Sequence, residues 1–147
     1  MKKRRILAAW GLTMAFLSGC GASFDVSQST LEDYANDNEG VYADVTSDYS
    51  DYDYVEGVYV VETDDIHVEL WDLDSTTDAS AWFQNNVETL KSTAKTNSGS
   101  STSNGGNYKF NTDDGYYRIL FSEDEGVYAH GDKEAVDAAL STMGIAK

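Results

Sequence analysis

A short acidic segment after an apolar stretch carries the residue types needed for phosphate chemistry. Asp72 and Asp74 lie two positions apart in Asp72-Leu73-Asp74-Ser75-Thr76. Clustered carboxylates hold magnesium, and a lysine can offset the charge of a bound phosphate. The segment is therefore compatible with metal-assisted hydrolysis of a phosphate ester. The same residue types also suit a strand exit followed by a helix N-cap, so this reading stays a hypothesis.

The segment resembles the first motif of haloacid-dehalogenase phosphatases. The resemblance implies that Asp72 is the nucleophile and that Asp74 is the general acid/base. It also implies that a later lysine, Lys95 or Lys109, and the acidic pair Asp113-Asp114 complete a magnesium site. That family has several parallel strands joined by crossover helices, whereas this chain offers one helix in such a position. Asp113-Asp114 also fits a hairpin turn. A surface phosphohydrolase is kept as an alternative, with no catalytic residue assigned.

Dedicated metal sites are not predicted. Oxygen-bearing side chains alternate at Asp72, Asp74, Thr76 and Asp78, which is how a calcium loop begins. A complete EF-hand loop would also need Gly in place of Thr77 and Glu in place of Phe83. His67 and His130 are the two histidines of the chain, and two cannot complete a zinc site without carboxylates. We expect no cofactor, and only weak divalent cation binding from the density of charge.

Aromatic and ionisable side chains share one predicted face of a sheet. If Ile66, Val68 and Leu70 face the helices, strand alternation turns the residues between them to the other side. The same argument for the later strands gives a possible binding face of His67, Glu69, Trp71, Lys109, Tyr116, Arg118, Tyr128 and His130. Such a face suits stacking and hydrogen bonding with a sugar, peptide or protein. Cross-strand pairs that only stabilise a solvated sheet would use the same residues.

Three helices are predicted to support these strands. Apolar residues recur at spacings of three and four over about 29–38, 78–95 and 133–143. Ser29 and Glu32 have the spacing of a capping box at the first helix. Asp132 is the predicted N-cap of the last helix, and Gly144-Ile145 its Schellman stop.

The strands are predicted over about 41–45, 54–63, 66–72, 108–112, 116–122 and 127–130. Asp64-Asp65 and Asp114-Gly115 are short enough to close hairpins. Residues 96–107 contain only Thr, Asn, Ser and Gly, which predicts a flexible loop. The expected fold is therefore α+β, with a mainly antiparallel sheet of four to six short strands and about three helices on one face. It forms a single acidic domain over residues 28–147.

Charge is divided unequally along the 147 residues. The chain has 26 Asp plus Glu and 10 Lys plus Arg, a net charge of −16, yet no acidic residue precedes Asp25. A protein with this excess of negative charge is repelled by nucleic acid and by anionic membrane surfaces. A single cysteine also excludes an intrachain disulfide framework.

The first residues read as a secretory leader, with Lys2 to Arg5 followed by an apolar run from Ile6 to Leu17. Leu17-Ser18-Gly19-Cys20 resembles the lipobox of bacterial lipoproteins. The resemblance implies removal of residues 1–19 and lipidation of Cys20, followed by a short tether over 20–27. The remaining 128 residues would carry 26 acidic and 6 basic groups, a net charge of −20. An ordinary signal peptide or an uncleaved anchor would read similarly.

The order of elements in the body resembles small uncharacterised lipoproteins of Gram-positive bacteria, which implies no known activity. The leading hypothesis is a non-catalytic, extracytoplasmic protein held at the cell membrane by its lipid. It would bind or scaffold an unknown protein, peptide or glycan, and no nucleic acid. The phosphohydrolase and an inhibitor or immunity-type protein are the alternatives.

Overall fold

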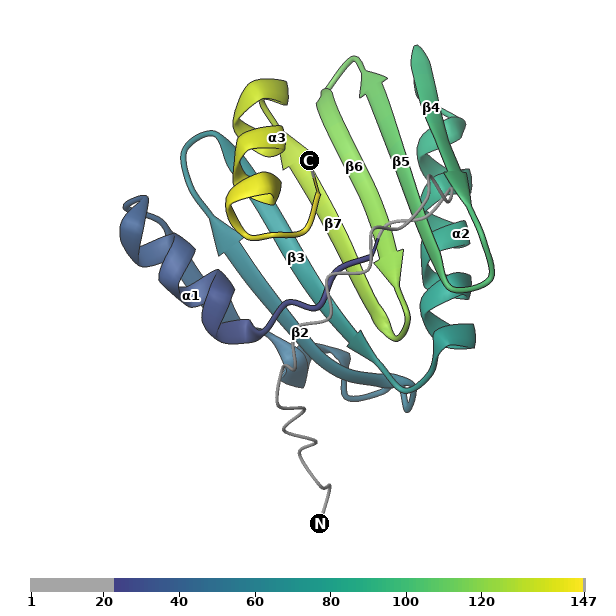
Figure 1. The fold of residues 1–147 in the computed structure, drawn as a ribbon, viewed down its shortest axis with the longest axis horizontal. Helices are drawn as coiled ribbons and strands as arrows, with labels where there is room; N and C mark the ends of the chain where they lie inside the picture. The colour runs from purple at the N-terminus through teal and green to yellow at the C-terminus, as the bar shows by residue number, and fades with distance from the viewer. Residues whose placement is uncertain (1–22, 147) are drawn as a thin grey trace, which may run out of the picture.

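The computed structural model describes residues 23–146, which build a seven-stranded antiparallel sheet with helices on both faces (Figure 1). The strand order is β1-β2-β3-β7-β6-β5-β4. The strands are β1 (Val41–Asp44), β2 (Val55–Glu62), β3 (Ile66–Leu73), β4 (Thr96–Ser101), β5 (Gly105–Thr112), β6 (Gly115–Ser122) and β7 (Glu125–Gly131). The helices are α1 (Gln28–Asp37), α2 (Thr76–Lys91), α3 (Lys133–Thr142) and the short 3₁₀ helix η1 (Thr46–Tyr49). The leader and Cys20 lie outside the described residues. The α+β class and the antiparallel sheet are confirmed.

The sheet has more strands than the four to six predicted, because β4 occupies part of the expected flexible loop. It pairs with β5 in a regular register from Thr96↔Asn111 to Ser101↔Gly106, and all six of its residues are exposed. An edge strand of this kind is held by backbone hydrogen bonds, which every residue type except proline can donate. Its Ser/Thr/Gly composition therefore gave no indication of a strand, and the predicted loop over 96–107 is wrong.

Helices cover both faces of the sheet, so the prediction of helices on one face is wrong. The α1/α3 face buries Val68, Val127 and Leu120 against those two helices. The opposite face buries Ile119 and Phe121 against α2. A strand buried on both sides reads as a nearly continuous apolar run, and Ile119-Leu120-Phe121 is such a run.

The helix ends follow local side-chain chemistry. Ser75 Oγ accepts from Asp78 N at 3.1 Å at the start of α2, and Asp132 Oδ1 accepts from Ala135 N at 3.1 Å at the start of α3. Gly144 has φ +75°, and Ile145 N donates to Leu140 O at 2.8 Å. The predicted N-cap and Schellman stop of α3 are thus confirmed.

The predicted capping box of α1 is wrong. The helix begins at Gln28 with Ser27 as N-cap, and the Ser27 side chain makes no capping hydrogen bond. The Oγ atoms of Ser27 and Ser29 are instead hydrogen-bonded to each other at 2.7 Å. Contacts between these two hydroxyls replace the reciprocal contacts to backbone that a capping box requires.

Residues 23–27, which we call the strap, lie on the α1/α3 face rather than hanging free as the predicted tether. Phe24 and Val26 are only 8% and 4% exposed. Phe24 N donates to Ser122 Oγ at 3.2 Å, and Val26 N donates to Glu125 Oε2 at 3.3 Å. The domain therefore begins at the strap and not at residue 28. Within residues 23–146, no helix has the length and apolar composition needed to cross a bilayer.

Candidate functional site

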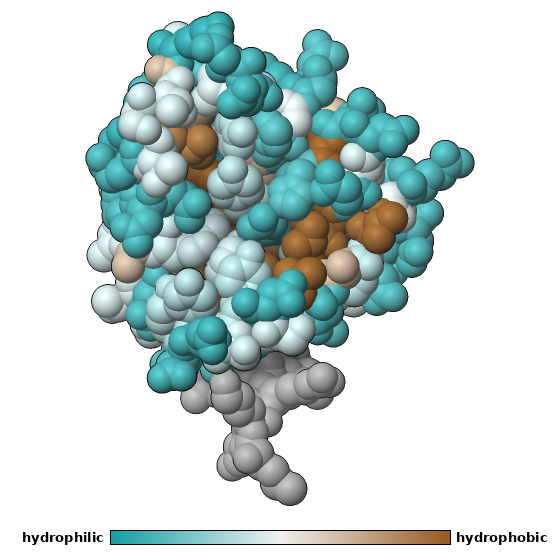
Figure 2. Space-filling model, turned by 180° about the vertical axis from the view of Figure 1, so that it is seen from behind, coloured by the Kyte–Doolittle hydropathy of each residue, from teal (hydrophilic) through white to brown (hydrophobic). Residues whose placement is uncertain are grey.

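The α2 side of the sheet is only partly covered, and its uncovered part is the candidate site. Helix α2 packs on β5, β6, β7 and part of β3, whereas α1 contacts β1 and β2 from the other side. Figure 2 views this side and shows a hydrophobic patch surrounded by hydrophilic atoms. Val41 of the edge strand β1 is 66% exposed, and Ala43 and Val60 beside it are half-buried. We call this surface the open face; its members are Val41, Ala43, Val60, Glu62, His67, Glu69, Trp71, Tyr128 and His130.

A hydrogen-bonded row of side chains crosses the open face. His67 Nδ1 contacts Glu62 Oε2, and His67 Nε2 lies 2.8 Å from Glu69 Oε1. Trp71 Nε1 donates to Glu69 Oε2 at 2.7 Å. The hydrogen bond to Glu69, assisted by Glu62 and opposed by burial, raises the pKa of His67 to about 9. An imidazolium has no lone pair for a metal or a substrate proton, so at neutral pH His67 holds Glu69 and Trp71 in place.

Aromatic rings wall one end of the open face. Tyr49 of η1 meets Trp71 edge to face with centroids 4.6 Å apart, and Trp71 lies 5.7 Å from Trp82 of α2. Gly126 makes room for this packing, because a Cβ there would lie 2.5 Å from the Trp82 ring. Tyr52 and Tyr54 continue from η1 and are 51% and 42% exposed. The wall thus combines fixed rings with rings that a ligand can reach.

A second aromatic group borders the face on β6 and β7. Tyr117 stacks on His130 with centroids 4.1 Å apart and planes at 18°, and it meets Tyr128 edge to face at 5.9 Å. Burial, followed by the charges of Tyr117 and Glu69, raises the pKa of Tyr128 to about 12. These tyrosines therefore act as neutral rings with hydroxyl groups over the physiological range.

The structure places five of the eight predicted binding residues together and separates the other three. His67, Glu69, Trp71, Tyr128 and His130 lie on the open face. Lys109, Tyr116 and Arg118 lie on the α1/α3 face, where Lys109 pairs with Arg118 across β5 and β6. The prediction that all eight residues share one face was wrong, because both faces of β6 carry apolar residues that point into a core. Val41 and Val60 were not predicted as site residues, since only strand register shows that they border this surface. Tyr49 belongs beside it through its ring contact with Trp71.

Arg118 is a structural residue under α3 and is 1% exposed. Its Nη1 lies 3.3 Å from Asp137 Oδ1, and its Nη2 donates to Asn107 Oδ1 at 3.1 Å. The Tyr116 hydroxyl also donates to Asp137, at 2.9 Å. Burial opposes the ionisation of Asp137, yet hydrogen bonds from Lys133 and Tyr116 and the charge of Arg118 lower its pKa. This cluster cannot meet a ligand without displacing α3.

The two aspartates of the phosphatase resemblance lie in an unsuitable setting. Asp72 is the penultimate residue of β3, on the α1/α3 face and opposite Glu125 in the register, and Asp74 N donates to Tyr54 O at 2.9 Å. Every strand pairing in the described sheet is antiparallel, whereas the resemblance implies parallel strands. Lys95 pairs with Asp113 at another edge of the molecule. Residues 23–146 contain no group of three or more His, Cys, Asp or Glu placed to hold a metal.

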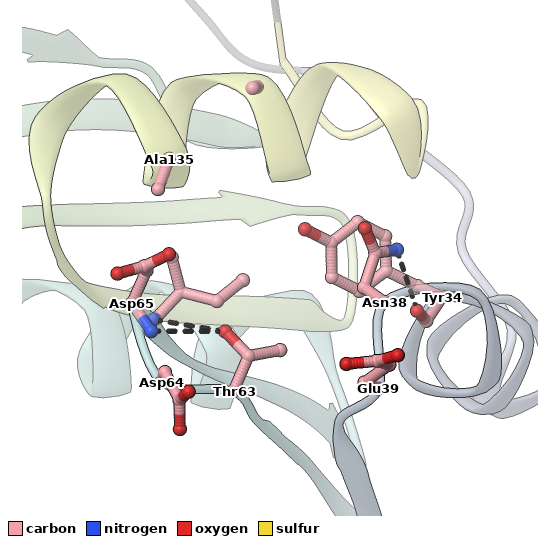
Figure 3. Close-up of a pocket in the computed structure, with 9 residues that line it drawn as sticks. Tyr34, Asn38, Glu39, Thr63, Asp64, Asp65 and Ala135 are labelled. Atoms are coloured by element: carbon pink, nitrogen blue, oxygen red, sulfur yellow. Dashed lines mark hydrogen bonds between the residues drawn. The ribbon is translucent and has the colours of Figure 1, made fainter.

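A cavity of about 280 Å³ lies between α1, α3 and the β2–β3 turn (Figure 3). Part of its polar lining is used by the fold itself. Asn38 Nδ2 donates to Tyr34 O at 2.8 Å, and Thr63 Oγ1 accepts from Asp65 N and Ile66 N, both at 3.3 Å. These contacts end α1 and form the turn, so the open face remains the better candidate site.

Comparison with protein-family models and with curated protein sequences finds no match for this chain. Among solved structures, the chain resembles the crystal structure of a GTP binding regulator from Thermotoga maritima. The two share 12% sequence identity with a TM-score of 0.51, over 85% of this chain and 92% of the other. At this identity the likeness shows a shared fold and carries no function to this chain.

Proposed function

We propose that the protein is a non-catalytic, lipid-anchored extracytoplasmic protein that binds a partner through the open face. The observation that carries the proposal is the part of a sheet face that no α-helix of residues 23–146 covers, with Val41 66% exposed at its edge. A monomeric domain rarely leaves an apolar sheet surface uncovered without a use for it. The aromatic walls on both sides give such a surface specific shape.

The open face is also preorganised. The row from Glu62 through His67 and Glu69 to Trp71 is tied by hydrogen bonds, and Tyr49 packs on Trp71. Side chains that are already ordered lose little entropy when a ligand arrives. The arrangement therefore favours binding over a purely structural role for these residues.

The proposed anchor and the strap together hold the domain near the membrane. Only Gly21 and Ala22 separate Cys20 from the strap. At about 3.4 Å per residue, Phe24 would lie within roughly 14 Å of the lipidated cysteine. The β6–β7 turn that binds the strap would then face the membrane, and the partner would be met there.

An inhibitor or immunity-type protein could use the same open face, and it differs from this proposal only in the consequence of binding. For the hydrolase alternative, residues 23–146 contain no group of three or more His, Cys, Asp or Glu placed to hold a metal, and β3 has antiparallel neighbours.

Site-specific photo-crosslinking in intact native cells tests the proposal. A photoreactive residue replacing Val41 should give a discrete crosslinked product in the membrane fraction. The matched control replaces Ala138, which is exposed on α3 at the other side of the sheet. The Cys20→Ala variant should lose the product from the membrane fraction. No product at Val41, or equal products at both positions, would refute binding through the open face, and unchanged membrane retention of Cys20→Ala would refute the anchor.

A further inference from the structure

The half of the sheet that carries the open face has no basic side chain of its own except His67. Residues 23–75 form the strap, α1, β1, η1, β2 and β3, and they contain 16 Asp plus Glu with no Lys or Arg. The basic residues of the described chain lie beyond this half, and four of them are paired with carboxylates: Lys91, Lys95, Arg118 and Lys133. Within residues 23–75, His67 meets Glu62 and Glu69, and no Lys or Arg is present to offset the other carboxylates of this half.

Carboxylates and tyrosines alternate along the segment that borders the open face. Tyr49, Tyr52 and Tyr54 form a chain of rings, with centroids 6.5 Å and 5.7 Å apart. The acidic residues between and beside them are Asp48, Asp51, Asp53 and Glu56. A ring face next to a carboxylate suits a Lys or Arg side chain, whose charge meets the acid while its stem covers the ring.

The protein's own lysines already use this combination elsewhere. Lys133 Nζ lies 5.2 Å from the Tyr116 ring centroid and 2.7 Å from Asp137 Oδ2. Lys91 Nζ lies 5.1 Å from the Tyr108 centroid and 3.5 Å from Glu88 Oε1. Tyr49, Tyr52 and Tyr54 have carboxylates beside them in the sequence, and residues 23–75 contain no Lys or Arg to meet them.

We propose that the open face docks a basic polypeptide segment of a partner protein. Apolar side chains of that segment cover Val41 and Val60, and its Lys or Arg side chains reach the tyrosines and carboxylates of residues 48–54. This inference rests on the proposed binding function and adds the chemistry of the partner.

Other ligand classes match the surface less completely. A neutral glycan could stack on the rings but would leave the acidic border without a counter-charge. A membrane of anionic lipid would be repelled by that border. A small amine would leave the apolar patch at Val41 and Val60 uncovered. Only a segment that carries both apolar and cationic side chains complements the whole surface.

Binding of defined peptides to the full chain in zwitterionic lipid nanodiscs tests the inference, with backbone amide shifts as the readout. The probe is a 12-residue peptide that repeats Lys-Val-Ser. The comparison peptides repeat Lys-Ser-Ser, which lacks the apolar side chain, and Glu-Val-Ser, which reverses the charge. We expect Lys-Val-Ser to bind at least tenfold more tightly than Lys-Ser-Ser, to shift Val41, Val60 and Tyr52, and to bind in preference to Glu-Val-Ser at every concentration.

Two variants with the same net charge separate docking from general attraction. Asp51→Lys with Asp53→Lys changes the border of the open face, and Asp33→Lys with Asp37→Lys changes the exposed side of α1 on the other face. The first pair should weaken Lys-Val-Ser binding at least tenfold, and the second less than threefold. Equal losses, or shifts centred on α1, would overturn the inference.

The outcome is distinguishable from a failure of the proposed function. If the Val41 crosslink forms in cells but no basic peptide binds, the open face has a partner of other chemistry and only this inference fails. Shifts at Tyr52 and Tyr54 caused by the nanodisc lipid alone, without peptide binding, would assign the surface to the membrane and also overturn it. If the crosslink is absent as well, the binding function itself fails.

Discussion

Arg118 shows how burial changes the role of a residue whose type suggests binding. Its guanidinium is enclosed between β6 and α3, and it depends on Asp137 and Asn107 for hydrogen bonds. Its Nε has no hydrogen-bond partner among the described residues. A buried charge in this situation is stabilised by one carboxylate, so the carboxylate matters more to stability than its own partial exposure suggests.

We therefore expect Asp137→Ala to lower the free energy of unfolding by about 3 kcal/mol, because it leaves the Arg118 charge uncompensated in the core. Lys133→Ala, which removes only the exposed partner of Asp137, should cost less than about 1 kcal/mol. Urea unfolding of the purified variants measures both. The double variant Arg118→Met with Asp137→Ala should recover part of the loss, since no charge is then buried. Equal costs for Asp137→Ala and Lys133→Ala would contradict this account.

Elements with local signals could be predicted from the sequence, and elements defined by pairing could not. The alternation of Ile66, Val68 and Leu70 gave the correct face of β3, and Gly144 gave the correct end of α3. β4 has no apolar periodicity and exists because its backbone pairs with β5. For the same reason the predicted binding face proved to be two faces. Alternation orders the residues within one strand, but only the register between strands relates Arg118 of β6 to Trp71 of β3.

The strap is a second element whose stability depends on a distant residue. Glu125 accepts from Val26 N while lying opposite Asp72 in the sheet register. Burial, with a smaller effect from the charges of Asp25, Asp72 and Asp124, raises the pKa of Glu125 from an ordinary 4.5 to about 8. Ionisation of this carboxyl therefore places a buried charge beneath the strap.

Stability should fall as the pH rises from about 5 to 8. Across this window the folded protein keeps a proton on Glu125 that the unfolded chain has released, so each step up in pH favours unfolding. His67, raised from 6.5 to about 9, extends the decline in the same direction above pH 6.5. In Glu125→Gln, the melting temperature should change little with pH between pH 5 and 6.5. In Glu134→Gln, which alters an exposed position of α3, it should fall with pH as steeply as in the parent. A parent melting temperature that is level or rises over this range would refute the assignment.

The molecule as a whole is electrically polarised along its sheet. Residues 23–75, which include β1, β2 and β3, have no Lys or Arg. Residues 89–112, which include β4 and β5, contain three Lys and no Asp or Glu. Repulsion among carboxylates is therefore concentrated in the half that also carries the open face. A basic partner would relieve this repulsion when it binds, and small cations should relieve part of it without a partner.

Salt should therefore stabilise the protein. Between about 20 and 200 mM NaCl the Debye length falls from roughly 20 Å to below 10 Å, which screens exposed carboxylates from one another. A gain of about 1 kcal/mol would raise the melting temperature by roughly 3–6 °C for a domain of this size. The Asp33→Lys with Asp37→Lys variant, whose net charge is less negative by four, should show a smaller rise than the parent. Scanning calorimetry at fixed pH measures both, with sucrose in place of salt to separate screening from solute exclusion. Equal rises in parent and variant would mean that ions act on the protein by a route other than screening of its carboxylates, and the polarised charge would then have no part in its stability.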